Sequence, residues 1–326
     1  MGPDAAPLFL VADIGGTNTR VALSDGPSLR TDTVRRYKNS AFDGLEAVLS
    51  AFMQDFAPCD VEGACIAVAG PVRDGKAHLT NRDWAIDADT VARPTGAKII
   101  SVLNDLAAQG HALGHIDEDQ LRWLAPGVAS ASPDRLVIGV GTGFNCAPVH
   151  DGAFGRLVSA AEAGHANLPI RTEEDLELLR FVETAHGFPA IEDVLSGRGL
   201  ERVDEWLSIR AGTPEKRSGA DIVAACKAGS DARADHAVRI FTRMLGTVAG
   251  NLSLVHLPFG GVFLIGGVVQ ALAPLMIPMG FSAAFTDKGR FSDFMEQFPI
   301  AVVEDDYAAL VGCAACLSRQ IQMNSS

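Results

Sequence analysis

Three glycine turns, each at the end of a short apolar run, constrain the fold of this chain more than any other feature. They are Ile14-Gly15-Gly16-Thr17 after residues 8–11, Gly139-Val140-Gly141-Thr142-Gly143 after residues 136–138, and Gly266-Gly267 after residues 262–265. Apolar runs of this length are typical of buried strands, and glycine lets backbone N–H groups face outward at a turn. Such N–H groups bind phosphate, so the three turns could be assembled around one ligand.

The first turn by itself admits two interpretations. Gly15-Gly16 between two apolar runs, residues 8–14 and 19–24, is also a common signal of a tight β-hairpin. No G-x-x-x-x-G-K-[ST] loop occurs in the sequence, and the second turn has Phe144 where a dinucleotide fingerprint needs its last glycine. The turns therefore indicate neither a Walker-type phosphate loop nor a dinucleotide-binding fold.

Composition favours a globular protein that acts on small molecules. The chain has 326 residues, of which 48% are hydrophobic, enough for two domains with a substantial core. A formal net charge of -13 argues against a general affinity for nucleic acid or anionic membranes. Residues 244–286 contain no Asp, Glu, Lys or Arg, but prolines and glycines divide them into a helix, a turn, a strand and another helix. We therefore expect this segment to be buried core and not a membrane span.

The cysteines predict reduced thiols and a cytoplasmic location, since they are scattered through a chain without a charged and apolar leader. Cys313-Ala314-Ala315-Cys316 is formally a C-x-x-C motif, but it lies in an alanine-rich helical pattern. We interpret it as a packed helix face and not as a metal or redox site. The six cysteines are Cys59, Cys65, Cys146, Cys226, Cys313 and Cys316.

Strands and helices alternate along the chain, which predicts an α/β sheet with helices on its faces. Asn104 and Asp105 follow the fourth predicted strand, where open α/β sheets bind their ligands. A second unit of similar plan begins at residue 135, so we expect a ligand in the cleft between two α/β halves. The predicted strands are residues 8–14, 19–24, 63–68, 98–103, 135–139, 262–265 and 300–303; the predicted helical regions are 44–55, 173–250 with a polar link at 211–219, and 307–321.

The order of the short motifs resembles that of bacterial glucokinases, which belong to the hexokinase and actin-like ATPase superfamily. The resemblance covers nearly the whole chain, and it rests on the series of motifs in one order and not on any single one. The matching segments are Ala12-Asp13-Ile14-Gly15-Gly16-Thr17-Asn18-Thr19-Arg20, Ala67-Val68-Ala69-Gly70-Pro71, Leu79-Thr80-Asn81-Arg82-Asp83-Trp84, Asn104-Asp105, Gly141-Thr142-Gly143, Glu162-Ala163-Gly164-His165, Glu192-Asp193-Val194-Leu195-Ser196-Gly197, Gly266-Gly267 and Phe285-Thr286-Asp287-Lys288-Gly289-Arg290.

The resemblance implies an α/β, two-domain actin-like ATPase (ribonuclease H-like) fold with a ligand cleft between a small and a large domain. The small domain would be residues 1–112, with the C-terminal helix 306–326 packed back on it, and the large domain residues 113–305. The implied activity is ATP-dependent phosphorylation of D-glucose at its 6-hydroxyl, at the entry to glycolysis. The family also implies ATP and Mg²⁺ as cofactors and favours a homodimer, with no nucleic acid or membrane partner.

In this family the aspartate of the Asn-Asp pair is the general base, a role that carries over to Asp105. From the residues alone, Asn104-Asp105 reads as an N-cap of the helix that follows, and both roles can coexist. The resemblance assigns sugar binding to Asn104, Glu162, His165 and Glu192. Alone, the two glutamates read as solvated charges and His165 as a turn residue.

The resemblance assigns the ATP phosphates to the first two glycine turns. Mg²⁺ is expected to be held mainly by phosphates and water, with Asp13 nearby and no cage made wholly of protein ligands. The third turn resembles the family's adenosine contact, although it also fits a plain strand-to-helix turn. The nucleotide-binding residues are Ala12, Asp13, Ile14, Gly15, Gly16, Thr17, Gly141, Thr142, Gly143, Gly266 and Gly267.

Two segments depart from the family pattern. Phe144-Asn145-Cys146 follows the second turn where many relatives carry a smaller residue or glycine, and the segment before His165 reads Ala161-Glu162-Ala163-Gly164 instead of a double glycine. These changes bear on nucleotide affinity and sugar preference. The zinc motif of the related repressor and sugar-kinase family is absent, because Cys59, Cys65 and Cys146 have the wrong spacing.

Two alternatives to a glucose kinase stay open. One is a sugar-sensing regulator without turnover, but such proteins normally carry a DNA-binding helix pair ahead of the fold, and here the first phosphate strand begins at Leu8. The other is a kinase of a different hexose, such as mannose or fructose. The same polar side chains can serve either sugar, so the residues separate this alternative poorly.

Overall fold

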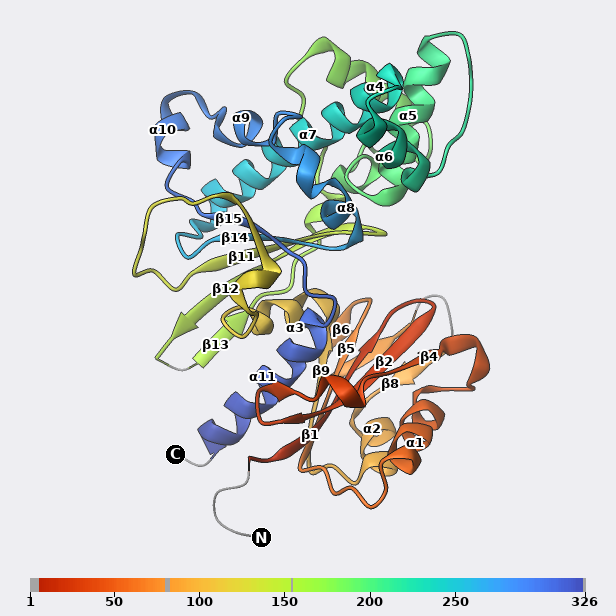
Figure 1. The fold of residues 1–326 in the computed structure, drawn as a ribbon, viewed down its shortest axis with the longest axis vertical. Helices are drawn as coiled ribbons and strands as arrows, with labels where there is room; N and C mark the ends of the chain where they lie inside the picture. Colours follow the sequence, from red (N-terminus) through yellow and green to blue (C-terminus); the bar gives the residue numbers. More distant parts are fainter. Residues whose placement is uncertain (1–5, 80–82, 154, 325–326) are drawn as a thin grey trace. The chain divides into compact units, whose positions relative to one another are not determined.

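The computed structural model describes residues 6–79, 83–153 and 155–324, and it divides the chain into two compact units (Figure 1). The first unit comprises Met1–Glu118, Ala153–Val158 and Asp305–Ser326. The second comprises Asp119–Gly152 and Ser159–Glu304. Residues 80–82 of the predicted motif at 79–84 lie outside the described residues, so that motif is described only in part.

The first unit is built on a mixed sheet in which β1 and β2 form an antiparallel hairpin. β1, β5 and β9 run parallel to one another, and β4 pairs with the other edge of β2. The hairpin interpretation of the first glycine turn is therefore correct, and the strands predicted here are confirmed. The strands, in the order β3-β2-β1-β5-β9 with β4 beside β2, are β1 (Leu8–Ile14), β2 (Asn18–Asp25), β3 (Ser28–Leu29), β4 (Arg35–Lys38), β5 (Gly63–Val68) and β9 (Ile99–Asn104).

Alternating side chains of β1 supply two separate cores, one on each face of this sheet. Leu10 and Ala12 pack with α1 (Leu45–Asp55) and α2 (Ala88–Thr95). Phe9 and Val11 pack with α3 (Asp105–Ala112) and α11 (Ala308–Asn324). A small separate sheet contains β6 (Val72–Arg73), β7 (Lys76–His78) and β8 (Ala85–Ile86).

Helix α11 lies against α3 at unusually short range. A Cβ atom at Gly312 in α11 would stand only 1.7 Å from the carbonyl oxygen of Ala108 in α3. Cys313 and Cys316 are free thiols on the buried face of α11, which confirms the interpretation of the C-x-x-C motif as a packed helix face. The C-terminal helix therefore supports the helix that begins at Asp105.

The second unit repeats the plan of the first. β11 and β12 form an antiparallel hairpin, and β11, β14 and β15 are parallel. The two α/β halves of similar plan that the sequence predicts are thus present, whereas the edge strand β10 and the hairpin strand β12 were not predicted. The strands of this unit, in the order β10-β15-β14-β11-β12, are β10 (Leu121–Ala125), β15 (Ile300–Val303), β14 (Val262–Ile265), β11 (Arg135–Val140) and β12 (Phe144–Gly152); β13 (Gly155–Val158) belongs to the first unit.

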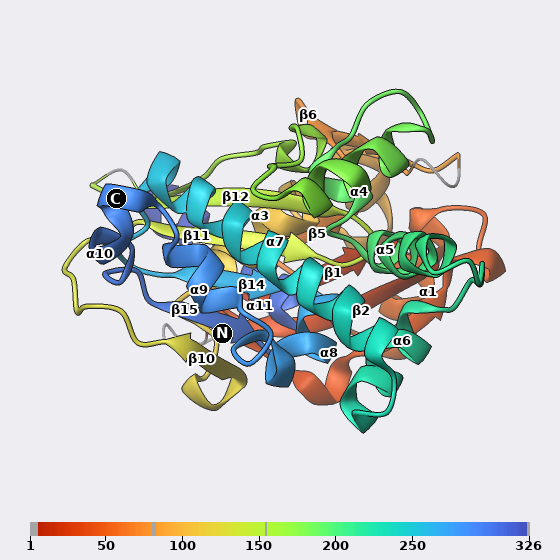
Figure 2. The ribbon, with the colours of Figure 1, turned by 90° about the horizontal axis from the view of Figure 1, so that it is seen from above.

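Helices make up most of the rest of the second unit, and the long α7 crosses over β11 and β14 in Figure 2. The predicted helical region 173–250 and its polar link are confirmed, because the link is the loop between α5 and α6. Arg217 in that loop forms ion pairs with the buried Asp204 and with Asp231. The helices are α4 (Glu173–Glu183), α5 (Gly197–Arg210), α6 (Gly219–Ala228), α7 (Ala232–His256), α8 (Gly267–Met276), α9 (Phe281–Thr286) and α10 (Ser292–Met295).

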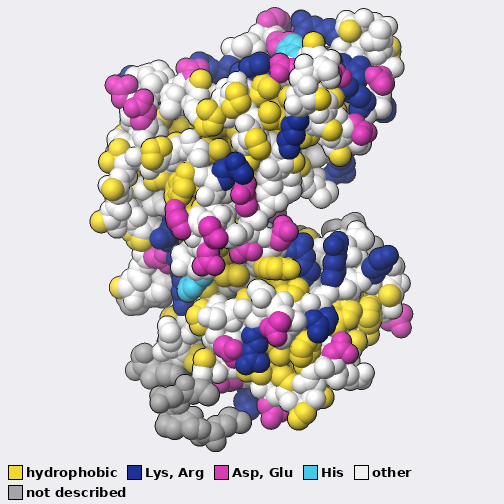
Figure 3. All heavy atoms as spheres, viewed as in Figure 1, with side chains coloured by type: hydrophobic (Ala, Val, Ile, Leu, Met, Phe, Trp, Pro, Cys, Tyr) yellow, Lys and Arg dark blue, Asp and Glu magenta, His cyan; other side chains and the backbone are white. Residues whose placement is uncertain are grey.

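The surface carries charges of both signs. On the face drawn in Figure 3, acidic and basic side chains are interspersed with hydrophobic ones over both units. In the part of the chain that the structure describes, no helix combines the length and the apolar character needed to cross a membrane.

Candidate active site

The three parallel strands of the first unit end at the same edge, where the predicted catalytic residue lies. Ile14 at the end of β1 pairs with Val68 at the end of β5, and Val68 pairs with Asn104 at the end of β9. The first glycine turn follows Ile14 and Asp105 follows Asn104. The structure therefore brings the turn and the Asn-Asp pair to one edge of the sheet.

A buried asparagine holds the first glycine turn in place. Asn39 Nδ2 donates to the Gly15 carbonyl at 2.8 Å, and the Asn39 backbone N–H donates to the Thr17 carbonyl at 2.9 Å. The Thr19 hydroxyl donates to Asn39 Oδ1 at 2.8 Å, which fixes the orientation of the amide. Gly16 and Thr17 remain exposed for a ligand. No motif pointed to Asn39, because it lies more than twenty positions after the turn.

Asn104 caps α3, as the N-cap interpretation predicts. Its Oδ1 accepts hydrogen bonds from the N–H groups of Leu106 at 3.0 Å and Ala107 at 3.3 Å. Its Nδ2 donates to the carbonyl of Gly70 at 3.0 Å. Gly70 has a φ of 151°, a backbone conformation that favours glycine. The Ala67–Pro71 motif thus orients Asn104, and the cap starts the helix at Asp105.

The Asp105 carboxyl has a pKa well above the ordinary value for an aspartate. Burial raises the pKa of Asp105 to about 6, although a hydrogen bond from the Leu106 N–H at 2.8 Å opposes the rise and the Asp13 carboxylate adds to it. Burial also raises the pKa of Asp13, and the charge of Arg20, its partner across the hairpin, opposes that rise. Two acidic groups with raised pKa values thus lie within electrostatic reach of each other beside the glycine turn.

In the second unit, β11 and β14 also end at one edge. Gly139 pairs with Ile265, and a Cβ atom at Gly266 would stand 2.4 Å from the carbonyl oxygen of Val140. The N–H of Gly197, the first residue of α5, donates to the Gly141 carbonyl at 2.8 Å. The second and third glycine turns and the start of α5 therefore meet at this edge.

The three predicted sugar-binding residues of the second unit lie around the second turn. Glu192 Oε2 accepts a hydrogen bond from the Phe144 N–H at 3.0 Å. A Cβ atom at Gly164 would stand 2.1 Å from the Phe144 carbonyl oxygen and 3.4 Å from Glu192 Cβ. The His165 N–H donates to the Glu162 carbonyl at 3.1 Å, so Glu162 and His165 flank this close contact.

Asn145 also belongs to this group, although its role was not predicted. Its Oδ1 accepts a hydrogen bond from the Ala163 N–H at 3.0 Å, and its Nδ2 donates to the Ala161 carbonyl at 2.5 Å. Nδ2 also lies 3.5 Å from Glu162 Oε2. The only feature of the sequence that could have pointed to Asn145 is its departure from the family pattern, because many relatives carry a smaller residue or glycine there.

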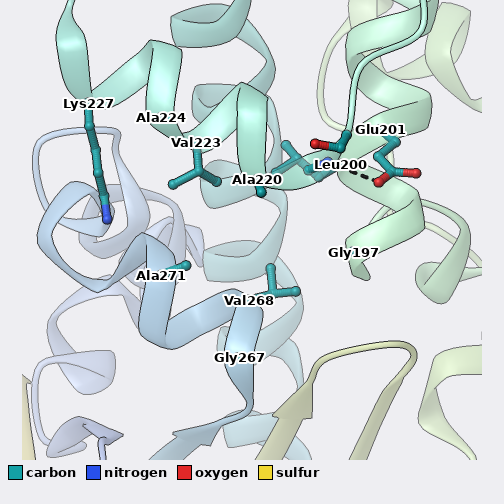
Figure 4. Close-up of a pocket in the computed structure, with 12 residues that line it drawn as sticks. Gly197, Leu200, Glu201, Ala220, Val223, Ala224, Lys227, Gly267, Val268 and Ala271 are labelled. Carbon is teal, nitrogen blue, oxygen red and sulfur yellow. Dashed lines mark hydrogen bonds between the residues drawn. The ribbon is translucent and has the colours of Figure 1, made fainter. Parts of the chain in front are cut away.

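A cavity of about 640 Å³ opens beside the third glycine turn (Figure 4). Its apolar lining comes from three helices of the second unit, and Glu201 Oε1 accepts a hydrogen bond from the Gly219 N–H at 2.9 Å in its wall. Gly197 lines the cavity, and its N–H is hydrogen-bonded to the carbonyl of Gly141 in the second turn. The cavity therefore adjoins the second turn as well as the third, to which Gly267 belongs. The lining residues are Gly197, Leu200, Glu201, Ser218, Gly219, Ala220, Val223, Ala224, Lys227, Gly267, Val268 and Ala271.

The chain is similar to known proteins over nearly its whole length. The glucokinase family model matches residues 10–320. A glucokinase from Ralstonia nicotianae is 33% identical over 327 residues, which span 96% of this chain and 95% of that protein. The chain belongs to the glucokinase family. The crystal structure of a glucokinase from an Antarctic psychrotroph is 29% identical, covers 96% of this chain and 99% of its own, and superposes with a TM-score of 0.85.

As a member of the glucokinase family the chain is a hexose kinase, a phosphotransferase with ATP as co-substrate. The predicted family, activity and fold class are thereby confirmed. A glucokinase of the ROK family from Streptomyces griseus, solved with glucose and AMPPNP, is 23% identical over 96% of this chain and 99% of its own. Its TM-score of 0.63 shows that the actin-like fold is shared.

The predicted site residues fall into two sets, one in each unit. The set of the first unit is Ala12, Asp13, Ile14, Gly15, Gly16, Thr17, Asn104 and Asp105; the set of the second is Gly141, Thr142, Gly143, Glu162, His165, Glu192, Gly266 and Gly267. Those of the first unit lie in β1 and at the carboxyl ends of β1 and β9, the glycine turns of the second unit follow β11 and β14, and Glu162, His165 and Glu192 lie in or beside short 3-10 turns near the second glycine turn.

Proposed function

We propose that Asp105 is the general base that accepts the proton of the glucose 6-hydroxyl as the hydroxyl attacks the γ-phosphate of ATP. A primary hydroxyl is a weak nucleophile, so a carboxylate within hydrogen-bond reach must take its proton. The observation that carries this proposal is the pKa of about 6 at a carboxyl at the end of β9. Such a group is mostly ionised at neutral pH and still basic enough to accept a proton.

Glucose binding is assigned to Glu162, His165 and Glu192, together with Asn104. Each sugar hydroxyl can donate and accept, and carboxylate and imidazole groups satisfy both needs. The Asn104 Nδ2 that bonds Gly70 carries a second hydrogen, which we assign to the sugar. An epimer that leaves one of these groups unpaired would lose about 1–3 kcal/mol of binding.

ATP is assigned to the three glycine turns and the adjoining cavity. Backbone N–H groups of Gly15–Thr17 and Gly141–Gly143 would bind phosphate oxygens. The cavity beside Gly267 would hold the adenosine, because its apolar walls suit a flat base and its volume of about 640 Å³ is ample.

Asp13 fits the role of a magnesium-binding or outer-shell group. Mg²⁺ prefers carboxylate and phosphate oxygens, and the raised pKa of Asp13 shows that a buried negative charge there is poorly compensated. Bound to ATP, the cation would neutralise charge that develops on the phosphoryl oxygens.

A panel of hexoses tests the substrate assignment. We expect ATP-dependent phosphorylation of glucose with a kcat/KM at least about tenfold above that of mannose or fructose, because an inverted or missing hydroxyl leaves a polar group of the site unpaired. Coupled assays of ADP release measure this directly. Equal rates across the panel, or a faster reaction with another hexose, would contradict glucose as the preferred substrate.

Filling the cavity tests the nucleotide assignment. Ala224→Phe places a ring inside it, so we expect the KM for ATP to rise at least about tenfold while the KM for glucose changes less than about threefold. Ala228→Phe is the matched control, since Ala228 is exposed one turn further along α6 and does not line the cavity. An unchanged KM for ATP in Ala224→Phe would place the adenosine elsewhere.

Three further properties complete the proposal. We propose that the two compact units are the enzyme's two domains, on the basis of their separate cores.

We also propose a homodimer, on the basis of the family resemblance. Sedimentation analysis of the purified protein would test it. A cytoplasmic location, where glucose enters glycolysis, is supported by six free cysteines.

A further inference from the structure

We infer that Asn145 is a positioning residue that fixes the sugar-binding loop and, through Glu162, sets the affinity for the hexose. The inference rests on the proposed role of Glu162 and adds a residue to which no motif assigns a part. It concerns contacts within the second unit only.

The Asn145 side chain bonds the backbone on both sides of Glu162. Nδ2 donates to the carbonyl of Ala161, the residue before Glu162, at 2.5 Å. Oδ1 accepts from the N–H of Ala163, the residue after it, at 3.0 Å. Together these bonds span the peptide groups that set the backbone direction at Glu162.

The amide itself is anchored on a strand. Asn145 is the second residue of β12, and the next backbone N–H, that of Cys146, donates to Asn145 Oδ1 at 2.8 Å. β12 is paired with β11 from Phe144 to Val149, and Asn145 pairs with Gly139, so the anchor belongs to the sheet. A side chain held in this way can keep the loop at residues 161–163 in a fixed position relative to the sheet.

Glu162 needs such an anchor because its own surroundings constrain it little. Its side chain is exposed, and its backbone has φ -129° and ψ 50°, outside helix and strand geometry. Holding one residue in a single backbone conformation costs conformational entropy, and hydrogen bonds from a rigid neighbour offset that cost. The Nδ2 atom, 3.5 Å from Glu162 Oε2, also favours a carboxylate directed toward Asn145 at the start of β12.

The two departures from the family pattern are bonded to each other in the structure. Asn145 Oδ1 accepts the N–H of Ala163, which belongs to the segment that lacks the double glycine. The asparagine side chain at 145 thus fixes the backbone of the loop at 163.

A double-mutant cycle tests the inference. Asn145→Ala is expected to raise the KM for glucose about tenfold, the effect of losing about 1.4 kcal/mol of hydrogen bonding, with kcat and the KM for ATP changed less than about threefold. In a Glu162→Ala background the same substitution should add less than about twofold, because the residue acts through Glu162. Asn251→Ala, on the exposed face of α7, is the control and should leave all three constants unchanged.

Asn145→Asp supplies a second variant in case Asn145→Ala does not fold. The aspartate keeps the acceptor for Ala163 but loses the donor to Ala161 and places a negative charge near Glu162, so the KM for glucose should again rise about tenfold. Full additivity with Glu162→Ala, or an unchanged KM for glucose in the folded Asn145 variant, would overturn the inference. An unchanged KM in Glu162→Ala alone would instead refute the proposed role of Glu162.

Discussion

Replacing Asp105 by asparagine or alanine is expected to lower kcat for glucose phosphorylation by at least about 10²-fold. Neither side chain can accept the hydroxyl proton, and loss of a general base usually has this magnitude. In the wild type, kcat/KM should fall about tenfold per pH unit below the Asp105 pKa of about 6, because protonation removes the base. Steady-state kinetics between pH 5 and about pH 8 measures both effects.

The substitution Asp105→Asn is also expected to increase the stability of the folded protein at neutral pH. The folded pKa of Asp105 is raised from 3.8 to about 6, so the folded state binds the proton more tightly than the unfolded state. Stability of the wild type therefore falls as pH rises through this window, by about 1–3 kcal/mol. Asp105→Asn, which does not titrate, should unfold at higher denaturant than the wild type at pH 8 and equally at about pH 4.

Asp43→Asn provides the matched control for these measurements. Asp43 is exposed and belongs to the same unit, so its replacement should alter neither kcat nor stability. Activity of Asp105→Asn within a few-fold of the wild type would refute the general base. A midpoint that falls at pH 8 would contradict the burial that raises its pKa.

Gly312→Ala is expected to cost about 3 kcal/mol or more of folding free energy and to lower kcat at the same time. The added methyl would stand 1.7 Å from the Ala108 carbonyl oxygen, so α11 and α3 must move apart. Because α3 begins at Asp105, its displacement moves the general base, and misplacement by about 1 Å can cost about 10²-fold in rate. Urea denaturation and glucose phosphorylation measure the two effects.

Gly44→Ala serves as the control for Gly312→Ala. Gly44 precedes α1 in the same unit, and a Cβ atom there would meet nothing within 4 Å. Because alanine is a poorer N-cap than glycine, its replacement should cost about 1 kcal/mol or less and leave kcat unchanged. If Gly312→Ala were as stable and as active as this control, the close helix contact would not support Asp105.

The sequence alone predicts features that arise from local patterns. Apolar runs that end in glycine predicted β1, β11 and β14, and the Asn104-Asp105 pair predicted the cap of α3. Each depends on residues within a few positions of one another, so the pattern can be read from neighbours in the chain. The edge strand β10 and the small β6–β8 sheet escaped prediction because such short strands carry little periodicity.

Tertiary structure decided how distant segments complete the site. Asn39 holds a turn more than twenty residues earlier, and Asn145 brackets Glu162 from another strand. Gly312 meets Ala108 across about two hundred positions of sequence. Local propensity contains no information about which distant backbone will arrive within hydrogen-bond or van der Waals range, because that is set by how the sheets and helices pack. The sequence therefore predicted the candidate site residues themselves. The residues that hold them in place, Asn39, Asn145 and Gly312, could be identified only from the folded structure.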